Sequence, residues 1–173
     1  MGQAPDPAVL ADIRQSAGWL TRHDETFARQ LYGEMTQLVP GSALPPAFAM
    51  EAFCRRMVRT LLWAALTDQP GHVVIDVVRE TGGQNWRAGF PDEEYANVAH
   101  ALVQAVRDLT SDDWSTSTGS AWVSFFLWAW PYLTDGAWRE SARDVSTERA
   151  GSPPGEADAG DGQIMALDDP RSR

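Results

Sequence analysis

The sequence predicts an all-α protein of about six to seven helices with a disordered C-terminal tail. Apolar residues recur at three- and four-residue spacing through most of the chain, and strand-like alternation is not sustained. From about residue 146, Gly and Pro become frequent and large apolar side chains become rare. Such a composition cannot bury enough apolar surface to fold. We therefore expect a folded domain over residues 1–145 and a disordered, acidic, Gly/Pro-rich tail over 146–173.

The first half of the chain predicts three helices. The first runs from about Pro7 to Trp19. The second begins near Asp24, and its apolar face consists of Phe27, Leu31, Met35 and Leu38. Segment 40–46 is rich in Pro and Gly, which predicts a corner. The third helix carries one apolar stripe, made of Phe53, Met57, Leu61 and Ala65.

The second half predicts further helices. Segment 68–71 interrupts the pattern, and a shorter helix follows to about Glu80. Within it, the run 73–78 is compatible with either a strand or a buried helix. We expect Gly82 and Gly83 to end this helix and Pro91 to begin the next. The apolar face of that next helix is Tyr95, Val98, Leu102, Val106 and Leu109, and a last helix starting near Ser115 contains Trp122, Phe126, Trp130 and Leu133.

Composition and charge exclude several functions. The net charge of -10 argues against nucleic-acid and anionic membrane partners, which need clustered cations. The chain contains no Lys, so Schiff-base chemistry on a lysine is excluded. The longest apolar stretch, from Trp122 to Leu133, is too short to span a bilayer. The N-terminal residues lack the regions of a signal peptide, and we expect a cytoplasmic protein.

The segment 82–95, GGQNWRAGFPDEEY, resembles the proximal segment of bacterial globins of the flavohemoglobin type. In that family a small turn carries the heme-ligating histidine, and an apolar residue and an acidic turn with a Tyr follow. Gly89, Phe90, Glu93 and Tyr95 match this order, but Asn85 stands where the family has histidine. Weaker similarities, at 31–35 with Pro40 and at 114–122, extend the resemblance over about Ile13 to Trp138.

The resemblance implies a globin-like fold with a heme pocket suited to oxygen binding. Tyr32 falls at the distal Tyr that hydrogen-bonds a bound gas. Phe53 falls near the distal position often held by Gln or His, and Met57 faces the pocket one helical turn further along. Phe48 is the best candidate for the aromatic residue that stacks on heme. Tyr95 falls beside the proximal side, and Val98 completes the implied cofactor-binding set.

Asn85 changes the chemistry that the resemblance implies. Neutral imidazole is a good iron ligand, whereas an amide oxygen is weakly basic. Phe53, on the distal side, cannot hydrogen-bond a gas ligand. Both departures predict loss of standard heme ligation, so we expect no cofactor, although the resemblance keeps heme open. His100, Tyr95 and Cys54 are the substitute ligands to consider, and no Cys/His set has the spacing of a zinc site.

The last helix is unusually aromatic in a chain that contains 8 Trp residues. Trp122, Phe126 and Trp130 predict a surface through which a second copy of the chain forms a homodimer. The alternative is an aromatic core that replaces the volume of a lost heme. The sequence leaves these two interpretations equal.

Three functional hypotheses follow. The first is a globin-fold protein without standard heme ligation that acts as a small-molecule-binding, sensory or interaction module. In it, Tyr32 and Asn85 would orient an apolar small molecule. The second is a heme protein that binds oxygen or nitric oxide through a substitute axial ligand. The third is a cofactor-free enzyme with Tyr32 as proton donor; since no acid/base pair or nucleophile supports it, the sequence favours a protein that is not an enzyme.

Overall fold

The computed structural model describes residues 5–39, 45–91, 94–111 and 114–151, with side chains described as far as residue 143. Within these residues the chain forms six α-helices and no strand, which confirms the all-α prediction. The helices are α1 (Pro7–Thr21), α2 (Asp24–Leu38), α3 (Ala47–Leu66), α4 (Gly71–Arg87), α5 (Tyr95–Leu109) and α6 (Thr116–Gly151). The ambiguous run 73–78 lies in α4 and is helical.

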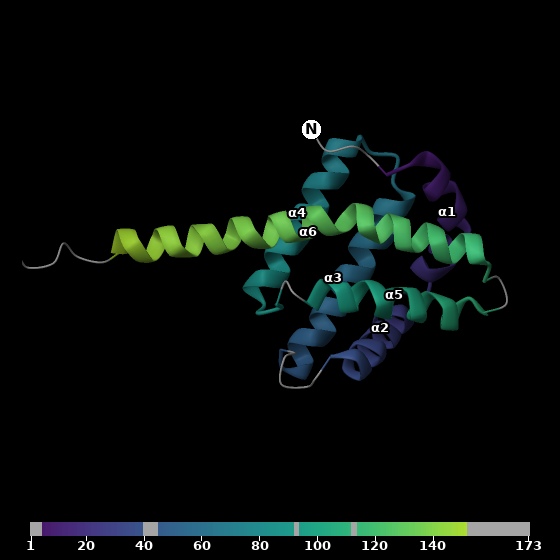
Figure 1. Ribbon diagram of the computed structural model, residues 1–173, viewed down its shortest axis with the longest axis horizontal. Helices are drawn as coiled ribbons and strands as arrows, with labels where there is room; N and C mark the ends of the chain where they lie inside the picture. The colour runs from purple at the N-terminus through teal and green to yellow at the C-terminus, as the bar shows by residue number, and fades with distance from the viewer. Residues whose placement is uncertain (1–4, 40–44, 92–93, 112–113, 152–173) are drawn as a thin grey trace, which may run out of the picture.

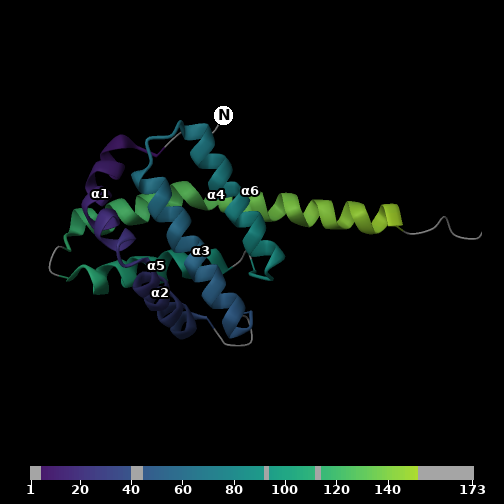
Figure 2. The same ribbon diagram turned by 180° about the vertical axis from the view of Figure 1, so that it is seen from behind.

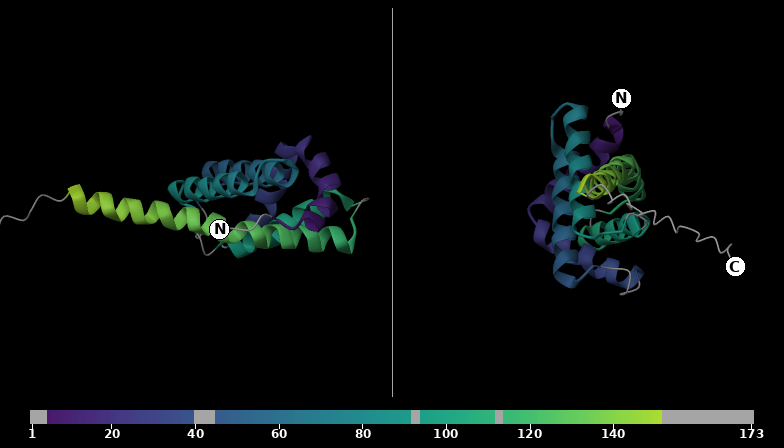
Figure 3. Two further views of the ribbon diagram at one scale, coloured as in Figure 1. Left: turned by 90° about the horizontal axis from the view of Figure 1, so that it is seen from above. Right: turned by 90° about the vertical axis from the view of Figure 1, so that its left-hand side faces the viewer.

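The helices form two crossing layers. α3 and α4 lie side by side, and α5 and α6 cross them on one side (Figures 1 and 3). α1 packs against α3 and α6, and α2 packs against α3 and α5. The view from behind shows α3 and α4 in front of the α5–α6 layer (Figure 2). This arrangement brings the C-terminal end of α4 close to α3 and to the start of α5, where the candidate site lies.

The predicted apolar faces form the core. Phe27, Leu31 and Met35 of α2 are buried, as are Phe53, Met57, Leu61 and Ala65 of α3. The predicted face of α5 is buried at Tyr95, Val98, Leu102 and Val106, and Leu109 packs against the same cluster. Leu38 is the exception, because it lies in the exposed last turn of α2.

The prediction that Gly82 and Gly83 end a helix is wrong. Helix α4 continues through both glycines to Arg87. The two glycines lie in the contact between α4 and α6. A Cβ atom at Gly82 would overlap the backbone carbonyl of Leu133, and one at Gly136 would overlap the carbonyl of Arg79. The absence of side chains at these positions therefore lets the two backbones touch.

The glycine that does end α4 is Gly89. Its φ of 81° is left-handed, and its amide donates to the carbonyl of Trp86 at 2.8 Å. This geometry is typical of a glycine just past a helix C-terminus. Asn85 consequently lies in the last turn of α4 and not on a turn of its own. Helix α5 begins at Tyr95, later than the predicted start at Pro91.

Two of the aromatic residues predicted to form a dimer surface are inside the chain. Trp122 and Phe126 are fully buried, and the Trp122 indole donates to Ser16 Oγ at 3.1 Å, which joins α6 to α1. Neither side chain is therefore available to a partner. Trp130 is half-buried and packs edge-on against Phe126.

Helix α6 is 36 residues long, and its C-terminal part extends beyond the other helices (Figure 1). It continues to Gly151, past the predicted start of the tail at residue 146. The remainder of the predicted tail, 152–173, lies outside the described residues. None of the helices in the described part of the chain is long and apolar enough to cross a membrane.

Candidate functional site

Asn85 is fully buried, and its side chain is held by hydrogen bonds from three directions. Its Oδ1 accepts from Arg56 Nε at 2.9 Å. Its Nδ2 donates to Tyr95 Oη at 3.2 Å and to Met57 Sδ at 3.3 Å. Residues of α3, α4 and α5 therefore meet at one amide group. We call Arg56, Met57, Asn85 and Tyr95, together with Phe53 and Phe90, the Asn85 cluster.

Three aromatic rings close the cluster beside this amide. The rings of Phe53 and Phe90 are stacked, with their centroids 3.8 Å apart and their planes 10° apart. The ring of Tyr95 meets Phe90 edge-on at 5.3 Å. The backbone also contributes, because the Phe90 amide donates to the Asn85 carbonyl at 3.0 Å and fixes the chain that carries this ring. The stack joins α3 directly to the segment that follows α4.

Arg56 gives the cluster a cationic edge. Burial lowers the pKa of Arg56 below its ordinary value; Tyr95 opposes that shift, and the nearby Arg87 cation adds to it. The Nη2 atom of Arg56 is buried and has no hydrogen-bond partner among the described residues. The hydrogen bond from Arg56 Nε to Asn85 Oδ1 therefore offsets part of the cost of burying the Arg56 charge.

A heme does not fit between these side chains as they are packed. A flat ring needs about 3.5–4 Å on each face, so two rings that enclose a porphyrin must stand roughly 7–8 Å apart. Phe53 and Phe90 are in contact with each other instead. Oδ1 is the only atom of the Asn85 side chain suited to bind iron, and it already accepts a hydrogen bond from the Arg56 guanidinium. The positive charge of that guanidinium would also repel iron.

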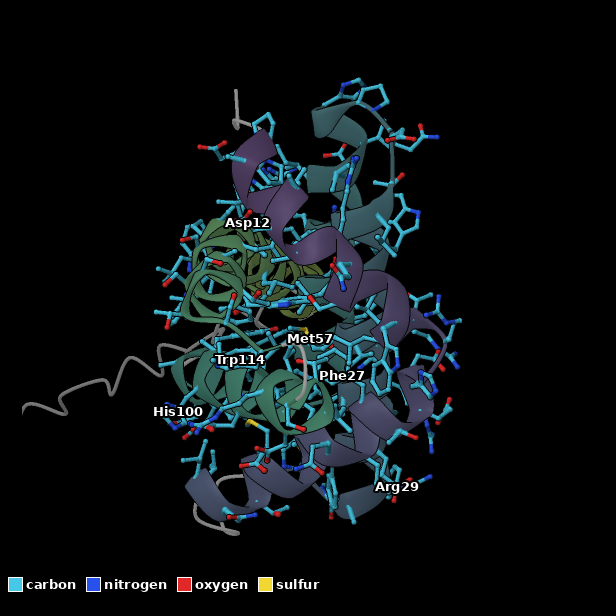
Figure 4. All side chains as sticks on the ribbon, turned by 90° about the vertical axis from the view of Figure 1, so that its right-hand side faces the viewer. Asp12, Phe27, Arg29, Met57, His100 and Trp114 are labelled. Atoms are coloured by element: carbon cyan, nitrogen blue, oxygen red, sulfur yellow. The ribbon has the colours of Figure 1, made fainter. Side chains whose placement is uncertain are left out.

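The structure brings four of the seven predicted cofactor-binding residues together: Phe53, Met57, Asn85 and Tyr95. Val98 is buried in the core one turn further along α5. Figure 4 shows Met57 in the interior, between the helices. Phe48 lies at the start of α3 and is 77% exposed, so its ring does not pack in the Asn85 cluster.

Tyr32 lies at a different place from the Asn85 cluster. It lines a cavity of about 190 Å³ between α2 and α3, together with Glu25, Ala28, Arg29, Glu51 and Arg55. Arg55 donates to Glu25 at 3.0 Å and to Glu51 at 3.3 Å, so this cavity has a charged wall. Arg29 points outward at its edge (Figure 4).

The three substitute iron ligands, His100, Cys54 and Tyr95, are respectively exposed, buried as a protonated thiol, and hydrogen-bonded within the Asn85 cluster. His100 is exposed on the outer side of α5 (Figure 4). Cys54 is buried, and burial, with a smaller effect of Glu51, raises the pKa of its thiol to about 12, which keeps it protonated. Tyr95 Oη accepts a hydrogen bond from Asn85. Across the described residues, no group of three His, Cys, Asp or Glu side chains is arranged to hold a metal ion.

An apolar groove of about 360 Å³ lies between α1 and α3, outside the Asn85 cluster. Its walls include Leu62, Trp63 and Leu66, and the ion pair between Arg59 and Asp24, 2.9 Å long, lies at its rim. An apolar small molecule of the predicted kind has more room in this groove than at Asn85.

The sequence interpretation missed Arg56. The residue follows Phe53 by three positions and precedes Met57 by one, so it shares the inward side of α3. An Arg within an apolar helical stripe needs a buried acceptor, and this was the signal that pointed to a polar partner. Phe90 was recognised only as part of the segment that resembles globins.

Comparison with protein families found no family model that matches this chain, and comparison with curated proteins found no match.

Proposed function

We propose that this chain is a globin-fold protein that works without heme, as an interaction module. The observation that carries the proposal is the direct contact of α3 with the end of α4. Arg56 and Asn85 are 2.9 Å apart and Phe53 and Phe90 are stacked, at the position where the resemblance implies a cofactor.

The chemistry of the cluster supports a structural role for its polar residues. Each hydrogen-bonding atom of the Asn85 side chain has a partner from another helix. These bonds hold three helices at one point, and breaking them would remove the acceptor of an Arg56 guanidinium whose Nη2 atom is already unpaired among the described residues, so the network is costly to open. Such a cluster favours a rigid scaffold over a ligand pocket.

Helix α6 supports the interaction part of the proposal. It is more than twice as long as α5, and exposed apolar side chains remain on it at Val123, Leu127 and Trp138. Large exposed apolar side chains that gather on one element are typical of protein contacts. The partner surface that we assign to α6 therefore uses these residues in place of the buried Trp122 and Phe126.

Titration of the purified chain with hemin tests the proposal. We expect no saturable Soret band, because opening the cluster would separate the stacked rings and leave the Arg56 charge without its acceptor. A saturable one-to-one band would overturn the proposal and support a heme protein with a substitute ligand. Tyr95→Phe and Cys54→Ser variants would then identify that ligand.

A further inference from the structure

One face of α6 carries no charge over most of the helix. At spacings of three or four residues, this face presents Thr116, Ser120, Val123, Leu127, Trp130, Thr134, Trp138 and Ser141. We call these residues the α6 stripe. Three of its four apolar members are exposed: Val123 is 43% exposed, Leu127 57% and Trp138 73%, whereas Trp130 is half-buried. The opposite face of α6 is buried against the domain through residues such as Phe126 and Leu133.

The lack of charge on the stripe is informative because the chain is strongly acidic. The net charge is -10, yet none of the eight stripe residues is Asp, Glu, Arg or Lys. The α6 charges that bind one another, such as Asp135 with Arg139, lie beside the stripe. An uncharged face does not select a basic partner, and it allows two copies of an acidic chain to approach without direct repulsion.

A projecting side chain and a hollow lie next to each other along one edge of the stripe. Trp138 projects from α6 and, with Thr134 of the stripe and the neighbouring Pro131 and Asp135, lines a shallow hollow of about 290 Å³. In a two-fold interface the same patch meets itself, so a patch must supply both parts of each contact. A projecting indole next to a hollow meets this condition.

We propose that a second copy of this chain docks on the α6 stripe, so that the two α6 helices pair about a two-fold axis. The inference rests on the proposed function as an interaction module and names its partner. The stripe is about 38 Å long. We expect a reversible dimer, with a dissociation constant on the order of micromolar.

Sedimentation velocity of the full chain, at about 1 to 200 µM, tests the pairing across the range expected for a dissociation constant of this order. The mass should rise from 19.0 kDa toward twice that value as concentration increases. Trp138→Glu and Leu127→Glu each place a charge on the stripe, and each should raise the dissociation constant at least tenfold. Both side chains are exposed, so circular dichroism should show unchanged helix content.

Phe48→Glu is the matched control. Phe48 is 77% exposed, similar to Trp138, and it lies on α3, outside the stripe. This variant adds the same charge and should dimerise like the original chain. A chain that stays monomeric throughout, or a dimer that Trp138→Glu and Phe48→Glu affect equally, would overturn the pairing. A monomer that still takes up no hemin would overturn this inference but leave the heme-free fold in place.

Discussion

The guanidinium of Arg56 donates a 2.9 Å hydrogen bond to Asn85 Oδ1, and this bond joins α3 to the last turn of α4. The residue that departs from the globin pattern thus has a partner that explains it. A histidine at this position would present a ring that becomes cationic near neutral pH to a guanidinium. An amide instead offers the guanidinium an acceptor and offers Tyr95 and Met57 a donor.

Replacing Asn85 with Leu should destabilise the fold by about 2–3 kcal/mol, because Arg56 loses the acceptor for a partly buried charge. Adding Arg56→Met should recover part of this loss, since the unpaired charge is then removed. Urea unfolding of the two single variants and the double variant measures the coupling. Strictly additive losses would show that the two side chains act independently.

Gly82→Ala should be severely destabilising, by about 3 kcal/mol, because the new Cβ would overlap the Leu133 carbonyl and force α4 away from α6. Gly33→Ala is the control. Gly33 is also helical, but a Cβ there meets nothing within 4 Å, so the change should stabilise α2 by roughly 0.5–1 kcal/mol. Thermal melting compares the two. Equal effects would contradict the close contact of the two backbones.

The ion pairs between α4 and α6 should make stability depend on pH. Burial raises the pKa of Asp135, but the hydrogen bonds from Arg79 and Arg139 outweigh burial and hold it below its ordinary value. A carboxylate with a lowered pKa in the folded state stabilises the protein above its ordinary pKa, and this contribution is lost as pH falls through the folded value.

Asp135→Asn should therefore cost the most near pH 7, and the cost should shrink as pH falls below the ordinary pKa of the carboxyl group. The cost should be about 1 kcal/mol or less, because the carboxylate is partly exposed. Urea unfolding of the original chain and the variant at a series of pH values measures the difference. Asp12→Asn, which removes an exposed carboxylate of α1 outside the contact between α4 and α6, is the control (Figure 4). A difference that grows toward acid pH would contradict the assignment.

Cys54 should be unreactive in the folded protein. Burial, with a smaller effect of Glu51, raises the pKa of its thiol to about 12, so hardly any thiolate exists at pH 8. A chromogenic disulfide reagent should react slowly with the native chain and rapidly in urea. Reaction of the native chain at the unfolded rate would show that α3 opens readily at this position.

Local patterns predicted most of the helices because the apolar spacing of each segment matches the face that it buries. The local patterns failed at Gly82 and Gly83, because glycine is common both at helix ends and where two helices pack closely. Only the position of α6 decides between these two roles. Tyr32 and Phe48 were assigned by the resemblance. Tyr32 lines a separate cavity between α2 and α3 and Phe48 is exposed, and no local pattern reveals either position.

The most direct test of the central claim is a hemin titration of Asn85→His. The variant restores the missing ligand but leaves the Phe53–Phe90 stack in place. We predict that it still shows no saturable Soret band. The packing of side chains closes the site, so restoring the histidine ligand alone does not open it. A one-to-one Soret band that appears with the histidine would contradict the account and show that the cluster opens to accept heme.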